Sequence, residues 1–416
     1  MTSTEAIAAF AADVEYDRLP TDVREATKRR VLDALGVGLR HRDSRTVEAV
    51  RRGLLADGGG ESGASRLWGS PMVAPPPQAA TINAVSVASG NGPAFLSPTP
   101  APAGGSIAAV LAAADAHEAT GEGTIAGIAT ALELHGECAR NAPLDGLNPA
   151  THTAIAAAAG AGRAMNLGES ALKNAIGIAA SRVTLAVGST TDPVPAGLAA
   201  SAGIRACSLA TGGVTGPDAF SAQNGWHDRL GPFDLDFDFG CERVRDAAVL
   251  PHDGTPYEQP AIGAAIDLAS DEPVDPADID AVSIETFDAA AEVIDPGRIA
   301  AALVDRELAV YYGMRTNLKP IAESVTVTGT EELTRQADRG AFPARITVEV
   351  HDGSAIESSV DGFEGHPMTP ASWGTVEEKF HAIGRGAYDR GRRDEIVRTV
   401  RSFEAETATE LARLLK

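Results

Sequence analysis

The spacing of apolar residues changes once along the chain, and this change constrains the fold more than any other feature. Before about residue 250, apolar residues recur three or four positions apart in segments rich in Ala and Gly, as on a buried helix face. After that point, residues 282–286 and 345–350 alternate between apolar and polar, as half-buried strands require. Helical spacing returns beyond Pro370. The sequence therefore predicts a mainly α protein with an α+β insert.

The segments before the insert are predicted to pack as a dense helical domain. Aromatic residues make up only 5% of the chain, whereas Ala and Gly are abundant, and small side chains let helix axes approach closely. The predicted helices carry apolar stripes at Ile7, Phe10, Ala11 and Val14, at Val31, Ala34, Leu35 and Gly38, over residues 107–114 and 154–165, at Leu172, Ile176, Ala179 and Val183, and over residues 197–209. Residues 89–105, which lack such a stripe, are expected to form a long loop.

The insert is predicted to be a separate small domain. Asp352-Gly353 suits a two-residue type I′ turn between strands 345–350 and 355–360, and helices are expected over 260–268 and 298–312. A chain of 416 residues exceeds the roughly 250–300 residues at which single cores stop growing. We therefore expect a helical domain over 1–247, an α+β domain over 248–376, and a helical return over 377–416 that docks on the first domain.

The charge of the chain excludes several classes of partner. It carries 57 acidic and 35 basic residues, a net charge of −22, which repels nucleic acid and anionic membrane surfaces. Because the acids are spread along the whole chain, we interpret the charge as a surface adapted to high salt. The chain does not open with a signal-like segment and lacks an 18-residue apolar run, so no membrane span and a cytoplasmic location are expected.

Metal binding is not expected either. Cys138, Cys207 and Cys241 lie far apart and form no CxxC motif, which argues against a zinc site or a disulfide framework and fits a reducing compartment. The acids of residues 234–239 alternate with apolar residues but lack a glycine where a calcium loop turns. We interpret this run as an irregular surface segment with one packed side.

Several strings follow one another in a distinctive order. They lie at residues 19–36, at 79–84 (AATINA), at 157–181 (ending AIGIAAS), at 352–370 (containing GHPMTP) and at 378–380 (EKF). This order resembles the MmgE/PrpD family, which includes 2-methylcitrate dehydratase, cis-aconitate decarboxylase and iminodisuccinate epimerase. The resemblance implies an all-helical domain built from both chain ends, an inserted α+β lid and usually a homodimer. It also implies a reaction without a cofactor, in which a base removes a proton next to a carboxylate of a small acid.

The chain departs from the family where the family carries its catalytic side chains. The His and Asp residues of the family's first loop are missing from residues 88–104, and Asn148 replaces the His of its "G.HP" motif. Asp192 lies in a motif where a Lys is usual, and Leu250 or a neighbour replaces the Lys before the lid. An amide cannot act as a base. If an anionic side chain replaces a cationic one 4 Å from a bound carboxylate, the electrostatic interaction becomes roughly 8 kcal/mol less favourable at an effective dielectric near 20.

A few side chains remain as site candidates. His152, His252 and Tyr312 are candidates for acid/base catalysis, and the candidates for substrate contact are Asn91, Asn148, Asp192, Tyr257 and Arg315. A cap at the helix start is the favoured role of His152, and packing is the more frequent role for the pair Tyr311 and Tyr312. Glu133 and His135, two residues apart on one helix, do not share a face and are interpreted as ordinary.

Two hypotheses of function stay open at this point. The first is a divergent lyase or isomerase that acts on a small carboxylic acid. The second is a catalytically inactive paralogue that acts as a partner or scaffold subunit, in a homodimer or beside an active relative. The residues at the site favour the second hypothesis, whereas the family resemblance favours the first.

Overall fold

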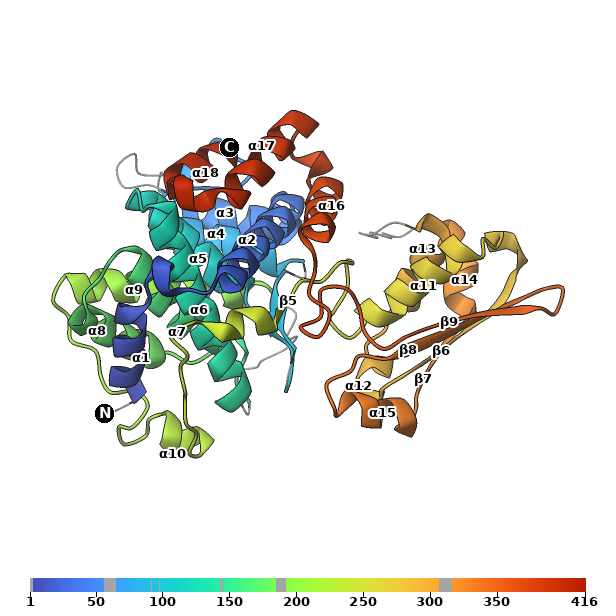
Figure 1. The fold of residues 1–416 in the computed structure, drawn as a ribbon, viewed down its shortest axis with the longest axis horizontal. Coiled ribbons are helices and arrows are strands. Elements are labelled where there is room, and N and C mark those ends of the chain that lie inside the picture. Colours follow the sequence, from blue (N-terminus) through green and yellow to red (C-terminus); the bar gives the residue numbers. More distant parts are fainter. Residues whose placement is uncertain are drawn as a thin grey trace. The chain divides into compact units, whose positions relative to one another are not determined.

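The computed structural model describes residues 3–55, 65–90, 92–96, 98–142, 144, 146–184, 192–306 and 316–416. Their contacts form two compact units (Figure 1). We call Met1–Ala248 with Val376–Lys416 the helical unit, and Val249–Thr375 the α+β unit. The protein is mainly α with an α+β portion, as the change in apolar spacing predicts.

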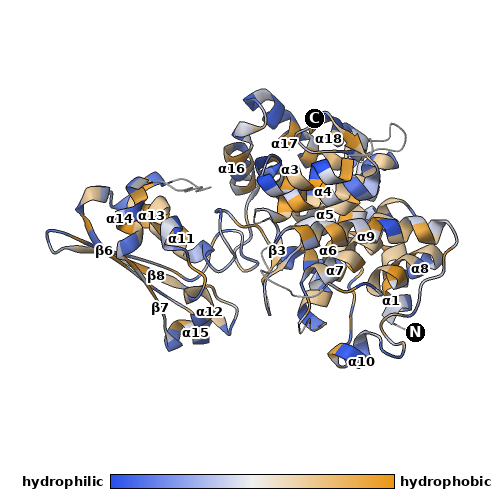
Figure 2. Ribbon diagram, turned by 180° about the vertical axis from the view of Figure 1, so that it is seen from behind, coloured by the Kyte–Doolittle hydropathy of each residue, from blue (hydrophilic) through white to orange (hydrophobic). Residues whose placement is uncertain are grey.

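Ala- and Gly-rich helices form the interior of the helical unit, and α5, α6, α7 and α9 are mostly pale orange in Figure 2. Where α6 meets α7, a Cβ on Gly160 would lie 2.5 Å from the carbonyl oxygen of Gly127, so only glycine allows this contact. The helices of this part are α1 (Ser3–Asp13), α2 (Thr21–His41), α3 (Arg45–Leu55), α4 (Pro76–Ala88), α5 (Gly104–Ala116), α6 (Gly121–Asn141), α7 (Ala150–Ala164), α8 (Glu169–Ala180), α9 (Val194–Thr211) and α10 (Trp226–Leu230), with 3-10 turns at Tyr16–Arg18 and Glu242–Asp246.

Short strands tie the loops of this unit together. Strand β3 (Ala94–Phe95) pairs antiparallel with β4 (Ala101–Pro102) and with β5 (Ala247–Ala248), and β1 (Ser65–Arg66) pairs with β2 (Val73–Ala74). The loop predicted over residues 89–105 thus contains two strands. Two residues per strand are too few to produce a period that a sequence pattern reveals.

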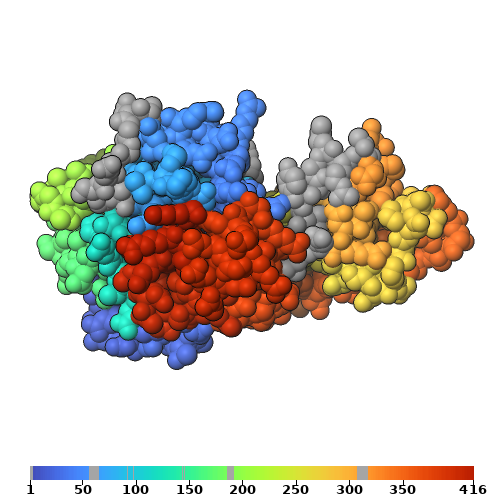
Figure 3. Space-filling model, turned by 90° about the horizontal axis from the view of Figure 1, so that it is seen from above, coloured from blue at the N-terminus to red at the C-terminus, as the bar shows by residue number. Residues whose placement is uncertain are grey.

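The C-terminal helices pack against the N-terminal ones. They are α16 (Trp373–Ile383), α17 (Arg390–Arg401) and α18 (Ala408–Leu414), with 3-10 turns at Gly384–Gly386 and Phe403–Ala405. Figure 3 shows this red segment against the blue N-terminal helices. The Lys379 ammonium donates to Asp33 of α2 in a buried ion pair, and the Lys28 ammonium donates to the Arg401 carbonyl oxygen at 2.7 Å.

The α+β unit contains a four-stranded sheet in the order β7 (Val325–Gly329), β6 (Ile279–Thr286), β8 (Ala344–Val350) and β9 (Ala355–Val360). Strands β6 and β7 are parallel, and the other pairs are antiparallel. Burial alternates along the strands, and α11 (Gln259–Asp271), α13 (Pro296–Asp305) and α14 (Lys319–Ser324) lie along one face (Figure 1). Shorter elements are α12 (Asp288–Ala291), α15 (Glu331–Ala337) and 3-10 turns at Pro276–Asp278 and Thr316–Leu318.

Three local predictions differ from the structure. The turn between β8 and β9 is not type I′, because only Gly353 has a positive φ, of 87°, and the Val350 amide donates to the Ser354 carbonyl across a three-residue loop. Val183 follows the end of α8 and is 49% exposed rather than part of its buried stripe. Helix α13 ends at Asp305, where Arg306 adopts a left-handed conformation, and residues 307–312 of the predicted helix lie outside the described residues.

Among the described residues, no helix combines the length and the apolar character needed to cross a membrane.

Candidate functional site

Three polar side chains from successive helices meet inside the helical unit. Ser106 lies in the first turn of α5, His135 near the end of α6, and His152 in the first turn of α7. The Ser106 hydroxyl is 3.0 Å from Nδ1 of His135, and the ring centroids of His135 and His152 are 6.1 Å apart. We call these three residues the histidine cluster.

The histidine cluster is sealed by apolar and aromatic side chains. Ser106 and His135 are 0% exposed and His152 is 3% exposed. The ring of Phe95 lies 5.6 Å from that of His135, and the indole of Trp226 stacks 6.2 Å from the imidazole of His152. Water is therefore largely excluded from the three polar groups.

Burial determines the charge state of both histidines. It lowers the pKa of His135 to about 4. It also lowers the pKa of His152 to about 3, with a smaller contribution of the same sign from His135 and an opposing one from the backbone of Ala142. Both imidazoles are thus neutral near pH 7. Nε2 of His135 and both ring nitrogens of His152 lack a hydrogen-bond partner among the described residues.

The geometry of the cluster restricts its chemistry. A serine hydroxyl at 3.0 Å from an imidazole has the contact that activates a nucleophile. However, a base with a pKa of about 4 is far from the neutral range in which general bases work best. The unpartnered nitrogens are more directly suited to holding a buried water molecule, which needs two to four polar partners.

His135, which the sequence leads us to interpret as ordinary, lies in the core of the helical unit. It shares the buried face of α6 with Ile128 and Leu132, at the spacing of four and three residues that marks an apolar stripe. This position on the core face is the sequence signal that identifies His135 as a buried imidazole. The contact with His152, 17 positions further on, depends on how α6 packs against α7.

The predicted contact residues Asn148 and Asp192 act as helix caps. Oδ1 of Asn148 accepts a hydrogen bond from the Ala150 amide at 2.9 Å, at the start of α7. Oδ1 of Asp192 accepts one from the Val194 amide at 3.0 Å, at the start of α9. Each side chain satisfies a backbone donor that the helix itself leaves without a partner.

The predicted residues His252 and Tyr257 belong to the α+β unit. The backbone amide of His252 donates to Oε1 of Gln259 at 2.9 Å, and its carbonyl accepts from Nε2 of Gln259 at 3.1 Å. The ring of Tyr257 packs 5.4 Å from that of Phe287 and 5.8 Å from that of Phe342, and burial raises the pKa of its hydroxyl. Both residues thus contribute to the local packing of this unit. The remaining candidates Asn91, Tyr312 and Arg315 lie outside the described residues.

A second buried polar group anchors the segment that follows α10. The Glu133 carboxylate accepts from the Arg243 amide at 2.7 Å, and Glu137 accepts from Nε of Arg243 at 3.1 Å. Burial raises the pKa of Glu133 to about 8. The ring of Phe237 stacks on that of Phe10 at 4.7 Å, which confirms that one side of residues 234–239 is packed. Within the ranges given above, His, Cys, Asp and Glu do not form a group of three able to hold a metal ion.

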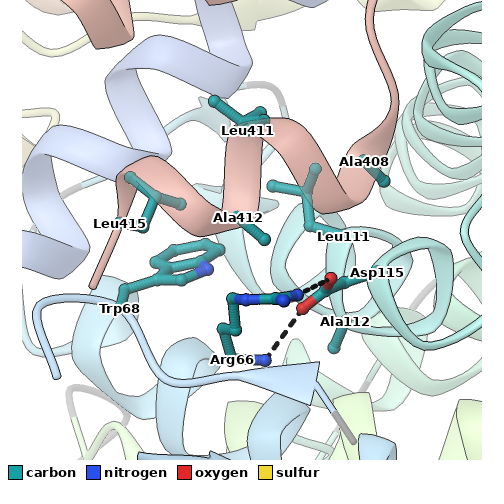
Figure 4. A pocket seen from close by; sticks show the side chains of 9 residues that line it. All are labelled: Arg66, Trp68, Leu111, Ala112, Asp115, Ala408, Leu411, Ala412 and Leu415. Atoms are coloured by element: carbon teal, nitrogen blue, oxygen red, sulfur yellow. Dashed lines mark hydrogen bonds and ion pairs between the residues drawn. The ribbon is translucent and has the colours of Figure 1, made fainter. Parts of the chain in front are cut away.

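A small pocket lies between α5, α18 and the strand β1 (Figure 4). The Arg66 guanidinium forms an ion pair with Asp115 across it, and the Asp115 carboxylate also accepts from the Arg66 amide at 2.9 Å. The space holds about one water molecule, too little for an organic acid. It is a packing contact of the C-terminal helix, lined by Arg66, Trp68, Leu111, Ala112, Asp115, Ala408, Leu411, Ala412 and Leu415.

Comparison with known protein families gives a match over the first part of the chain. Residues 5–235 match the family model described as the MmgE/PrpD N-terminal domain. This range contains the histidine cluster and both helix-capping residues, and it covers more than half of the 416 residues. No curated protein matches the chain.

Proposed function

The chain belongs to the MmgE/PrpD family, and from that premise we propose that it is a catalytically inactive member that acts as a subunit of an assembly. The observation that carries the proposal is the role of Asn148. Its side chain occupies the position of the histidine in the family's "G.HP" motif, and its oxygen caps α7 at 2.9 Å from the Ala150 amide. An amide in this role neither removes a proton nor carries a positive charge.

The other substituted position supports the same proposal. Asp192 occupies a motif in which the resemblance leads us to expect a lysine, and its carboxylate caps α9. Lys and Arg are absent from the sequence between Arg140 and Arg163 and between Arg182 and Arg205. A cation has therefore not moved to a neighbouring position in either segment, and a small polycarboxylate loses its expected partner there.

The histidine cluster favours a second candidate function, a divergent lyase or isomerase of a small carboxylic acid. In this alternative, His152 acts with His252 and Tyr312 as acid/base groups, and Asn91, Asn148, Asp192, Tyr257 and Arg315 contact the substrate. The unpartnered ring nitrogens of His152 favour it, because buried polar groups without partners are uncommon outside functional sites. The depressed pKa and 3% exposure of His152 argue against it.

Proton exchange at carbon distinguishes the two functions. Purified protein in molar potassium chloride is incubated in D2O with 2-methylcitrate, cis-aconitate or iminodisuccinate, and NMR follows the C–H signals and any new products. We expect neither deuterium incorporation nor product above the rate without protein. Exchange that is lost in His152→Leu and kept in His117→Leu, a change at an exposed histidine of the same unit, would establish the lyase or isomerase function instead.

A further inference from the structure

Arginines are concentrated in two short segments of a strongly acidic chain. Residues 40–45 and 385–393 together contain seven of the 30 arginines but only two of the 57 acidic residues. The two segments are therefore positive, whereas the chain as a whole carries a net charge of −22. We call these seven residues the arginine patch: Arg40, Arg42, Arg45, Arg385, Arg390, Arg392 and Arg393.

The fold brings the two segments together in the helical unit. Helix α17 packs against α2 (Figure 1), and Nη2 of Arg42 donates to the Gly386 carbonyl at 2.8 Å. Burial raises the pKa of Tyr388 to about 12, and the positive charges of Arg42 and Arg392 oppose this rise, which places both guanidinium groups near its hydroxyl. Cations from both segments thus flank one tyrosine.

Part of the arginine patch lies where positive charge is unfavourable for a helix. Arg390, Arg392 and Arg393 occupy the first turn of α17, which contains no acid. The helix macrodipole makes an N-terminus positive, so anions stabilise it and cations destabilise it. Only the N-cap residue Asp389, which accepts from the Arg392 amide at 2.9 Å, opposes these charges. The arrangement is costly for α17 by itself and becomes favourable when a further anion covers it.

Neighbouring acids neutralise the arginine patch only in part. Arg42 and Arg392 each pair with a nearby acid at 3.2 Å. The side chain of Arg390 is 87% exposed and pairs with its acid only at 4.0 Å. Arg45 and Arg385 are exposed, and neither forms an ion pair with another residue of the described ranges. Exposed guanidinium groups of this kind can hold a carboxylate through two parallel hydrogen bonds.

We propose that the arginine patch binds a short acidic segment of a partner protein. Carboxylates complement the seven cations and supply the anion that the start of α17 lacks. A short segment can stay within the patch, whereas a long polyanion such as nucleic acid extends over the acidic remainder of the surface and is repelled. At 1 M salt the Debye length is about 3 Å, so salt removes this long-range repulsion but acts less on partly buried contacts.

This inference goes beyond the assembly role proposed above and does not depend on it. The arginine patch contains neither a member of the histidine cluster nor the substituted positions Asn148 and Asp192. If proton exchange is found, the proposal of an inactive subunit fails while the acid-binding surface remains testable. If the acidic probe does not bind, the surface fails and the exchange result is unaffected.

Peptide binding tests the proposal with a matched pair of double variants. Arg385→Gln with Arg390→Gln removes two exposed cations of the arginine patch. Arg335→Gln with Arg339→Gln removes two exposed cations at and after α15, so both variants have the same net charge. Arg335 matches Arg390, because each pairs weakly with an acid four residues away on its own helix, at 3.8 Å and 4.0 Å.

The probe is a fluorescein-labelled peptide of ten glutamates, and fluorescence anisotropy measures its binding. The potassium chloride concentration is the lowest at which circular dichroism shows all three proteins folded. We expect the patch variant to bind about tenfold more weakly than the unchanged protein, because two exposed ion pairs are lost, and the α15 variant to bind as the unchanged protein does. No binding to the unchanged protein, equal binding to all three, or tighter binding of a thymidine decanucleotide than of the peptide would overturn the proposal.

Hydrogen exchange locates the contact in the unchanged protein and needs no variant. We expect the glutamate peptide to slow amide exchange in residues 384–393, and a glutamine peptide of the same length to leave it unchanged. Residues 331–339, which contain the control arginines, should exchange at the same rate with and without either peptide. Slowing that is absent from residues 384–393, or equally large for both peptides, contradicts an acid-binding surface at the start of α17.

Discussion

Replacing His152 by leucine tests whether the histidine cluster is neutral and sealed. In the unfolded chain a histidine has a pKa near 6.5, whereas burial holds His152 at about 3 and His135 at about 4. Below pH 6.5 the unfolded state therefore binds protons that the folded state does not bind, so the free energy of unfolding falls as the pH falls. Between pH 6.5 and pH 5, each imidazole contributes a loss of about 2 kcal/mol, at 1.36 kcal/mol per pH unit.

The comparison of variants isolates this contribution. Urea unfolding at constant high salt, followed by helical circular dichroism, gives the free energy of unfolding at pH 7 and pH 5. We expect the difference between the two pH values to be smaller by about 2 kcal/mol in His152→Leu than in the unchanged protein. The raised pKa of Glu133 acts in the opposite sense, because its folded form gains a proton as the pH falls, but it is common to both proteins and cancels.

Two results would refute the reasoning. One is an equal pH dependence in His152→Leu and the unchanged protein, which means that the His152 imidazole is protonated in the folded state at pH 5. The other is a similar reduction in His117→Leu, whose exposed imidazole belongs to the same unit. The first result means that the cluster is not sealed, and the second that the effect is not specific to a buried imidazole. In either case the argument against His152 as a base in contact with substrate loses its support.

Three further predictions concern packing. Lys379→Met leaves the buried Asp33 carboxylate without its ion-pair partner and should cost about 3–5 kcal/mol in urea unfolding, whereas Asp33→Leu combined with Lys379→Met should recover most of this. Gly121→Ala places a Cβ 1.6 Å from the Phe403 carbonyl oxygen and should cost about 1–3 kcal/mol, with earlier release of the C-terminal segment in limited proteolysis. Because burial raises the pKa of all three thiols, that of Cys207 to about 12, an aromatic disulfide reagent at pH 8 should label them only after denaturant is added.

Long periodic segments were the most predictable part of the fold. The stripes over residues 107–114 and 197–209 fall within α5 and α9, which are longer at both ends, and the stripe over 154–165 lies in α7 except for Met165, which follows its last residue. Helices α7 and α9 begin directly after Pro149 and Pro193, which are better markers of the helix start than the first stripe residue. The alternation after residue 250 correctly indicated β6, β8 and β9.

Pairing between distant segments was not predictable in the same way. The parallel register of β6 with β7, and the small sheet that joins β3 to β5, depend on residues far apart in sequence. The turn between β8 and β9 was predicted from Asp352-Gly353, but the chain closes the hairpin with one more residue. Local propensity allows both loop lengths, and the strand register selects between them.

The candidate site was likewise predictable from the sequence only where no contact between distant segments is involved. The sequence is sufficient to predict, through the family resemblance, that an amide stands at Asn148 where the family motif has an imidazole. The capping roles of Asn148 and Asp192 require knowledge of where α7 and α9 begin. The contact between His135 and His152 requires the packing of α6 on α7.

Buried and half-buried cations of the helical unit are already engaged in holding its segments together. The Arg30 guanidinium donates to the Ala247 carbonyl at 2.9 Å, Lys379 pairs with Asp33, and Arg243 pairs with Glu137. Burial lowers the pKa of Arg30 to about 10, so it remains charged at neutral pH and needs these acceptors. A carboxylate substrate that recruited one of these cations would have to leave a buried carbonyl or carboxylate without its donor. Recruiting any of these three cations for anion binding would therefore cost a packed acceptor its donor, and this is why the substitutions that the resemblance predicts at Asn148 and Asp192 weigh more heavily than the total number of basic residues.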